Sequence, residues 1–202
     1  MQKARISAAS IDAVIITHLH GDHMAGLPFL FLACQFSSRR KRRLVVTGPR
    51  GSQKQLTSLA NACYHVLSPD KLRFPVSYIE VDTGDEFTVS GARISAFAMN
   101  HTRPEVCLGY RIQIGGKTIA FSGDTDWCDA LVTISDGADL LLIECTNYST
   151  RIPGHLTYQQ IVHHRNKLCA RRIVLTHVGD ELLRNASRVR LPIARDVGKI
   201  VL

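Results

Sequence analysis

This chain contains nine short apolar runs rich in β-branched residues, and they restrict the folds that it can adopt. Turn residues separate the runs, so each run predicts a strand rather than part of a long buried helix. Gly115 and Gly116, between two of the runs, indicate a two-residue hairpin turn and therefore an antiparallel pair. The predicted strands are residues 13–17, 44–47, 76–81, 87–89, 92–98, 108–114, 117–122, 140–144 and 172–176.

Helical patterning alternates with these strands. Thr157 is a candidate N-cap of the last helix, because it precedes Gln160 by three residues as in a capping box. The sequence shows no internal repeat and no linker-like segment, so its length predicts a single α/β domain over residues 1–202. Its strands would form one mixed sheet, or two sheets covered by helices. The predicted helices are residues 26–36, 52–67, 127–136 and 157–170.

The chain is basic, because 25 Lys and Arg residues against 17 Asp and Glu residues give a formal net charge of +8. Such a charge concentrates phosphate-bearing ligands near a protein surface. A solvated loop that keeps the chain soluble is one interpretation of its densest basic segment. Contact with a nucleic-acid backbone is the other. This segment is the unbroken run Arg39, Arg40, Lys41, Arg42 and Arg43.

Several classes of protein are disfavoured by composition. The apolar runs stay shorter than the roughly 18 residues of a membrane span. The first residues lack the apolar core and cleavage site of a signal peptide, so we expect a cytoplasmic protein without membrane contact. The six cysteines are scattered and form no C-x-x-C pair, which argues against a disulfide scaffold or a cysteine zinc site.

A dense group of potential metal ligands follows the first predicted strand: His18, His20, Asp22 and His23. Imidazole and carboxylate groups are preferred ligands of zinc and similar divalent ions. Two histidines at alternate positions can direct both rings toward one point as the chain leaves a strand, while Asp22 and His23 turn toward a neighbouring point. The segment therefore predicts a metal site with room for two adjacent ions.

Three more candidate ligands, His101, Asp124 and His177, each follow an apolar run. Loops at the ends of sheet strands are where a rigid scaffold commonly presents functional groups. We therefore expect all three side chains to converge on the first group of ligands.

The segment H-L-H-G-D-H at residues 18–23 resembles the H-x-H-x-D-H signature of the metallo-β-lactamase-fold hydrolases. The three later candidates match further motifs of that family in the expected order, so the resemblance spans residues 11–183. It implies an αββα sandwich of two mixed sheets and a site for two divalent metal ions. The implied ligands are His18, His20 and His101 for one ion, Asp22, His23 and His177 for the second, and Asp124 as a bridge between both.

Within that superfamily the chain is most similar to ribonuclease Z and its phosphodiesterase relatives. The similarity lies in HLHGDHMAGLPFLF, FSGDT, GADLLLIECT, RIVLTHV and the short segment at residues 154–157. In this branch the histidine of an H-x-T motif assists proton transfer. The resemblance therefore implies that His155 protonates the leaving group, that Glu144 orients His155, and that Asp22 orients or deprotonates the attacking water. Three other histidines fall in predicted helices and are expected to have no role in the site: His65, His163 and His164.

Two features depart from the ribonuclease Z pattern. Only a strand, a Gly-Gly turn and a second strand join His101 to Asp124, where that enzyme usually carries an arm that clamps tRNA. This favours smaller phosphodiesters. Only eleven residues precede Asp12, so the N-terminal strands of the fold are expected to be missing. Either the start has been truncated, or another chain, such as a second copy in a homodimer, covers the exposed sheet edge.

We therefore expect a binuclear-metal phosphodiesterase that cleaves a small phosphodiester, a cyclic phosphate or RNA through a metal-bound hydroxide. The ions would be zinc, with manganese or iron as alternatives, because mixed histidine and carboxylate sites accept all three. A second hypothesis keeps the metals but replaces the substrate by a thioester, a lactone, a sulfate ester or a β-lactam. A third is a nucleic-acid-binding protein whose hydrolysis is impaired.

Overall fold

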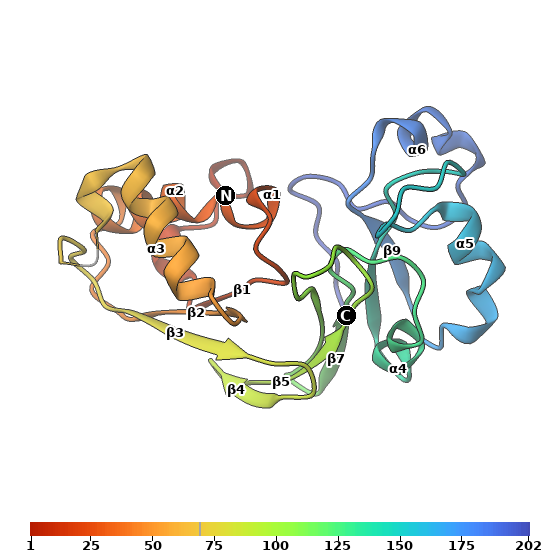
Figure 1. Ribbon diagram of the computed structural model, residues 1–202, viewed down its shortest axis with the longest axis horizontal. Coiled ribbons are helices and arrows are strands. Elements are labelled where there is room, and N and C mark those ends of the chain that lie inside the picture. The colour runs from red at the N-terminus through yellow and green to blue at the C-terminus, as the bar shows by residue number, and fades with distance from the viewer. Residues whose placement is uncertain (69) are drawn as a thin grey trace. The chain divides into compact units, whose positions relative to one another are not determined.

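The computed structural model describes residues 1–68 and 70–202, which form two compact units, Met1–Asp82 and Thr83–Leu202. Each unit has its own sheet and its own buried apolar cluster. Figure 1 colours the first unit from red to yellow and the second from yellow-green to blue. The two sheets confirm the predicted α/β class, whereas the single domain and the missing N-terminal strands stay predictions.

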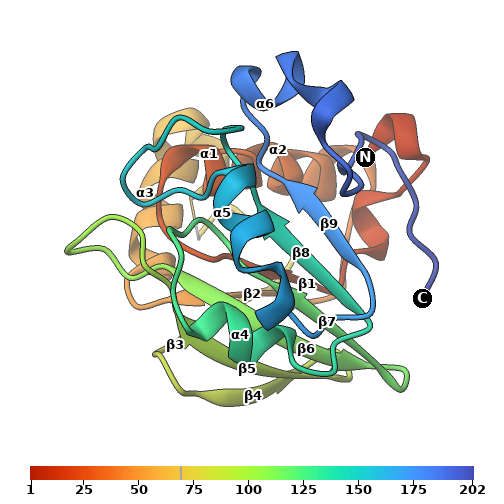
Figure 2. The ribbon, with the colours of Figure 1, turned by 90° about the vertical axis from the view of Figure 1, so that its right-hand side faces the viewer.

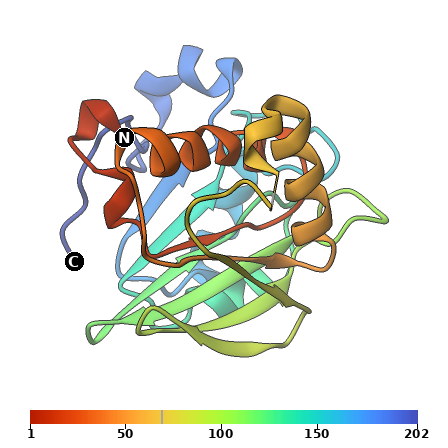
Figure 3. The same cartoon turned by 90° about the vertical axis from the view of Figure 1, so that its left-hand side faces the viewer.

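The sheet of the first unit has three parallel strands. Parallel neighbours need a crossover, and helices supply both crossovers here. Figures 1 and 3 show helices α2 and α3 over one face of this sheet. The elements are β1 (Ala13–Ile15), α1 (Gly21–Met24), α2 (Leu27–Leu32), β2 (Leu44–Pro49), α3 (Ser52–Cys63) and β3 (Val76–Val81).

The core of the first unit anchors the predicted metal-binding loop on both sides. Ile16, just before the loop, and Met24, at the end of α1, are both buried in this core. Deeper in the same cluster, the rings of Phe31 and Phe74 meet edge to face with their centroids 6.1 Å apart. Burial of apolar residues at both ends therefore holds the intervening histidines on a short, constrained loop.

The sheet of the second unit has six strands and is mixed. The pairs among its first four strands are antiparallel, and the fourth, fifth and sixth strands pair in parallel. Gly115 and Gly116 form the predicted hairpin turn with φ angles of 56° and 74°, a region that glycine tolerates. The strand order is β4 (Glu86–Val89), β5 (Ala92–Ala98), β6 (Leu108–Ile114), β7 (Lys117–Phe121), β8 (Leu140–Glu144) and β9 (Ile173–Thr176).

Three helices contribute apolar side chains to the core of this sheet: α4 (Ala130–Ser135), α5 (Tyr158–His163) and α6 (Asp180–Arg184). Figure 2 shows α4 and α5 in front of the strands. Leu131 from α4 and Ile161 from α5 are fully buried together with Leu141 from β8. The mixed sheet and its helical cover therefore share one continuous apolar layer.

All nine predicted strands are confirmed, and each observed strand begins and ends within two residues of its prediction. The prediction of one helix over residues 157–170 is wrong at its C-terminal end, because α5 ends at His163 and a 3₁₀ turn follows at Arg165–Lys167. Leu168 leaves the helical path with φ −91° and ψ 101° and is buried in the core. Burial of this side chain leads the chain directly into β9.

The helix predicted over residues 52–67 likewise ends early, because Tyr64 is extended and a 3₁₀ turn, His65–Leu67, takes its place. The helix predicted over residues 26–36 continues past α2 as a π-helical turn, Ala33–Ser37. Among the described residues the longest helix, α3, has 12 residues, and none is long and apolar enough to cross a membrane.

Truncation of a core side chain should destabilise the second unit. We expect Leu141→Ala to lower the free energy of unfolding by about 2–5 kcal/mol, because a fully buried side chain leaves a cavity in a packed core. Urea unfolding followed by the fluorescence of Trp127, the only tryptophan, measures this unit. Ile114→Ala is the matched control, since Ile114 is 46% exposed. Equal losses for both variants would contradict the placement of Leu141 in the core.

Candidate metal centre

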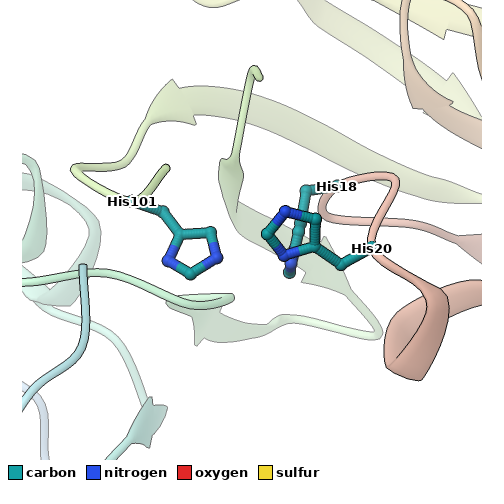
Figure 4. A group of neighbouring side chains, drawn as sticks. All are labelled: His18, His20 and His101. Atoms are coloured by element: carbon teal, nitrogen blue, oxygen red, sulfur yellow. The ribbon is translucent and has the colours of Figure 1, made fainter. Parts of the chain in front are cut away.

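Three histidines gather on the loop and helix that follow β1. The ring of His18 lies with its centroid 4.6 Å from that of His20 and 4.0 Å from that of His23. Figure 4 shows how the side chains of His18 and His20 lie. His18 is fully buried. Imidazole nitrogens are preferred ligands of zinc and similar ions, so rings packed this closely suit a metal ion.

Asp22 and His23 follow in α1. A carboxylate oxygen of Asp22 lies 3.2 Å from Nε2 of His23, and the Asp22 side chain is 65% exposed while that of His23 is 16% exposed. The first unit therefore brings together all four residues of the predicted ligand motif. Its donor atoms are nitrogen and oxygen only.

In the second unit, His101 follows β5 and is half-buried. Its Nδ1 atom lies 2.8 Å from the carbonyl oxygen of Gly154. A carbonyl can only accept, so Nδ1 carries the proton and Nε2 keeps the lone pair for a ligand. Figure 4 shows the ring of His101 as it leaves the loop. This contact fixes both the tautomer and the orientation of the ring.

Asp124 lies in the loop that follows β7 and is 3% exposed. Hydrogen bonds to a neighbouring strand hold this loop. The backbone N–H of Thr125 donates to Oε1 of Glu144 at 2.8 Å, and the N–H of Glu144 donates to the hydroxyl of Ser122 at 2.9 Å. The carboxylate of Asp124 is therefore positioned by the backbone on both sides of it.

His177 follows β9 with φ 52°, a left-handed conformation that is uncommon for a histidine and is typical of functional sites. The hydroxyl of Thr146 lies 3.0 Å from Oε2 of Glu144 and 3.1 Å from Nδ1 of His177. Because the hydroxyl has one proton and a carboxylate accepts, Thr146 donates to Glu144 and accepts from Nδ1 of His177. The lone pair of His177 is then on Nε2.

The lone pair on Nε2 of His177 bears on whether these residues suit a cation. Nε2 of His177 lies 3.3 Å from a carboxylate oxygen of Asp124. Two acceptors this close need a proton or a cation between them. Within the same unit, His101, Asp124 and His155 each place one ligand atom within 4.8 Å of the others. A mixed set of imidazole and carboxylate donors fits zinc, manganese or iron.

Glu144, the residue expected to orient His155, has that contact. Nδ1 of His155 lies 2.9 Å from Oε1 of the buried Glu144 carboxylate. The ring of His155 stacks on that of His177 with an interplanar angle of 8° and a centroid distance of 5.5 Å. It also meets the ring of His101 edge to face at 4.8 Å. His155 therefore lies beside the predicted ligands of this unit.

Two buried thiols near these loops do not join the donor set. Burial, with a smaller contribution from the Asp124 carboxylate, raises the pKa of Cys107 to about 12. Burial also raises the pKa of Cys145 to about 12, with the neighbouring Glu144 carboxylate as the second cause. Both side chains stay protonated at neutral pH, and only thiolates are strong metal ligands and nucleophiles.

Two further residues shape this site without having been predicted to do so, Thr146 and Gly154. Thr146 stands two positions after Glu144, but a threonine in a loop gives no signal until its neighbours are known. Gly154 precedes His155 and has φ 80°, and a Cβ atom there would lie 2.9 Å from Nδ1 of His101. Of the histidines expected to have no role, His65 contacts Asn61 and His164 stacks on Trp127.

A family profile described as "Beta-lactamase superfamily domain" matches residues 1–178, which confirms the family resemblance inferred from the motifs. Among curated relatives, the "Ribonuclease Z" of Staphylococcus carnosus is 34% identical over 190 residues, which cover 70% of this chain and 60% of that protein. The "Ribonuclease Z" of Staphylococcus haemolyticus is 37% identical over 108 residues, which cover 54% of this chain and 33% of that protein. The chain thus spans between a third and three-fifths of the length of these relatives.

Solved structures show the same fold. The metallo-β-lactamase fold protein YhfI from Bacillus subtilis is 25% identical, with a TM-score of 0.71 over 93% of this chain and 76% of that one. The short form of human tRNase Z is 24% identical, with a TM-score of 0.72 over 98% of this chain and 81% of that one. The predicted α/β fold with two sheets is therefore confirmed, although the three-stranded sheet is wholly parallel and not mixed as expected.

Substitution of Gly154 should disturb His101. We expect Gly154→Ala to weaken zinc binding by about 10- to 100-fold, because the new Cβ displaces the group that fixes the His101 ring. Competition with a chromophoric chelator measures the affinity. Gly91→Ala is the matched control, since Gly91 has the same φ of 80° with open space around it. If both variants lose equal affinity, backbone strain rather than the His101 contact is responsible.

Removal of the Thr146 hydroxyl should leave the proton of the neutral His177 ring no longer fixed on Nδ1. We expect Thr146→Val to weaken zinc binding by about 10- to 100-fold and Thr146→Ser to restore it, because only the serine keeps a hydroxyl that accepts from Nδ1. Nitrogen NMR shifts of the His177 ring report the tautomer directly. A valine variant with an unchanged tautomer and affinity would show that Thr146 has no positioning role.

Proposed function

Because the chain belongs to the beta-lactamase superfamily, we propose that it is a metal-dependent hydrolase that cleaves phosphodiesters. One observation carries the proposal: the pairing of Nε2 of His177 with the Asp124 carboxylate at 3.3 Å, on side chains that neighbouring groups hold in place. A buried carboxylate and a half-buried imidazole presented to each other in this way are suited to ligating a metal ion rather than to stabilising the fold.

The ligand assignment that we propose follows the motif match. Two divalent ions, most simply zinc, would lower the pKa of a water molecule and offset the negative charge of a phosphodiester. Manganese and iron suit the same donors. The proposed ligands are His18, His20 and His101 for one ion, Asp22, His23 and His177 for the other, and Asp124 for both.

The chain's own groups supply the proton transfers in this proposal. Asp22, which is exposed, orients the attacking water or accepts its proton. His155 donates a proton to the leaving oxygen as a general acid. The buried Glu144 carboxylate lies 2.9 Å from Nδ1 of His155 and orients the ring. In the same way, a buried aspartate orients the catalytic histidine of a Ser-His-Asp triad.

For the substrate, we propose RNA or a smaller phosphodiester. The relatives named Ribonuclease Z support a nucleic-acid substrate. The short β6–β7 hairpin, Leu108–Ile114 and Lys117–Phe121, stands where an RNA-clamping arm would be inserted between His101 and Asp124. A short connection at this point favours small or single-stranded substrates over a folded tRNA.

Turnover of bis(p-nitrophenyl) phosphate, with the metal content measured in the same sample, tests the proposed function. We expect Asp124→Ala to abolish both metal binding and turnover, because it removes the shared ligand. His155→Ala should keep the metal but lower kcat by about 10²- to 10⁴-fold, the usual contribution of a general acid. His65→Ala, on an exposed histidine that contacts Asn61, is the control and should leave both unchanged.

The outcomes separate the alternatives. Bound metal without turnover would contradict phosphodiester hydrolysis and direct the search to thioesters, lactones, sulfate esters and β-lactams. An absence of both metal and turnover in the unsubstituted protein would favour a binding protein with an impaired site. Full turnover of His155→Ala would remove this residue from the mechanism.

A further inference from the structure

A basic pocket of about 350 Å³ lies in the first unit, at the end of the π-helical turn that follows α2. We propose that this pocket binds one nucleotide of a single-stranded RNA, with its phosphate on the cationic groups and its base on the ring of Phe36. The site would hold the substrate of the proposed function, on which this inference rests. Its lining residues are Gln35, Phe36, Arg39, Arg40, Lys41 and Arg73.

The pocket is strongly basic. Four of the six described lining residues are cationic, and the described lining contains neither aspartate nor glutamate. Arg39, Lys41 and Arg73 are exposed, so their charges are available to a ligand. A concave surface lined by charges of one sign raises the local concentration of an anion. Guanidinium and ammonium groups both bind phosphate, the first through paired N–H donors and the second as a compact charge.

The pocket is held by the buried side chain of Arg40, which the sequence alone placed with its exposed neighbours. Arg40 is 3% exposed. Its Nε donates to the carbonyl of Arg42 at 2.8 Å, and Nη1 donates to the carbonyl of Ala9 at 3.0 Å. Arg42 forms an ion pair with Asp12 at 3.0 Å and lies outside the described lining. The run at residues 39–43 is therefore a folded segment with its own internal support.

Backbone geometry adds an independent sign of function. Arg39 has φ 48°, a left-handed conformation that costs free energy for a residue other than glycine. The preceding turn, Ala33–Ser37, is π-helical, a rare conformation that is enriched at functional sites. Arg39 lines the pocket in this conformation, and the backbone N–H of the next residue, Arg40, donates to the carbonyl of Cys34 at 2.7 Å.

A second segment completes the pocket from outside the basic run. The backbone N–H of Arg73 donates to Oε1 of Gln35 at 2.9 Å, and Nε2 of Gln35 donates to the carbonyl of Val66 at 3.3 Å. The guanidinium carbon of Arg73 lies 5.8 Å from the centroid of the Phe36 ring, within cation–π range. The Phe36 side chain is still 48% exposed.

The exposed ring selects among anionic ligands. Proteins that bind single-stranded RNA combine a basic groove for the backbone with aromatic rings on which bases stack. Inorganic phosphate or an acidic peptide would use the cations and gain little from Phe36. The combination of three exposed cations and one exposed ring therefore favours a nucleotide within RNA over these anions.

Binding of a fluorescein-labelled oligouridylate of about 12 nucleotides, followed by anisotropy, tests the inference. All measurements use the Asp124→Ala background, which is expected to lack turnover, so that cleavage of the RNA does not interfere. We expect the double variant Arg39→Gln, Lys41→Gln to lower affinity at least about tenfold and to reduce the salt slope by about 0.7, since one phosphate contact to a single strand contributes about 0.7. Phe36→Leu should lower affinity about tenfold and leave the salt slope unchanged.

The chain offers a matched control for Arg73→Gln. Arg188 is also exposed, and its guanidinium carbon lies 5.6 Å from the centroid of the Tyr148 ring. Arg188→Gln therefore removes the same charge from the same kind of pair outside the pocket. We expect Arg73→Gln to weaken RNA binding by about tenfold and Arg188→Gln by less than about twofold, because a long-range charge effect is screened by salt.

Three results would overturn the inference. Equal losses for Arg73→Gln and Arg188→Gln would show that net charge alone attracts RNA. An unchanged affinity in Phe36→Leu, with inorganic phosphate competing fully, would leave an anion site without a base contact. Stronger binding of a phosphopeptide than of the oligouridylate would assign the pocket to a protein partner.

The inference and the proposed function can fail separately. Turnover of bis(p-nitrophenyl) phosphate is measured in the same pocket variants with Asp124 intact. Loss of RNA affinity with full turnover supports the pocket as a substrate-holding site. RNA binding that depends on the pocket, in a protein that hydrolyses no phosphodiester, would sink the proposed function and keep the pocket. Unfolding midpoints of the variants should match that of the parent, because the substituted side chains are exposed.

Discussion

The carboxylate of Glu144 is buried at the end of β8, and the loops of the second unit are arranged around it. It accepts hydrogen bonds from the backbone N–H of Thr125 and Leu156, from the hydroxyl of Thr146 and from the ring of His155. A buried charge is costly unless such donors surround it. Satisfying this one group therefore fixes the loops that carry Asp124, His155 and His177. A conservative change at this position would disturb several candidate site residues at once.

The parallel part of the sheet explains why these loops meet. Phe121 pairs with Leu142, and Glu144 pairs with Thr176, so β7, β8 and β9 end at the same edge. Residues that follow parallel strands then lie side by side although they are far apart in the sequence. Hydrogen bonds between the loops also orient the rings of His101 and His177, because each bond places a proton on Nδ1 of its ring. The arrangement holds imidazole lone pairs and a carboxylate ready for a cation.

Charge in this protein has two structurally different uses. Arg40 is buried and binds backbone carbonyls, so it stabilises the segment that carries its neighbours. Arg39 and Lys41 remain exposed and line the same pocket as Phe36, and Arg73 joins them from a distant part of the sequence. The formal net charge of +8 does not show which cationic side chains are buried and which are exposed. The basic pocket is therefore a property of the fold, although three of its six described lining residues belong to the basic run.

Sequence by itself determined the strands, the ligand motif and the family, because these depend on local periodicity and on a short, specific spacing of His and Asp. It failed where long-range packing competes with local preference, as when α5 ends at His163 and Leu168 is buried in the core, although helical patterning predicted a helix over residues 157–170. Only the tertiary structure decided that Thr146 and Gly154 set the tautomers of His177 and His101, that Glu144 links three loops, and that Arg40 is buried while Arg73 lines a pocket. The physical reason is that a hydrogen bond or a buried charge acquires its role from partners that the chain brings together only when it folds.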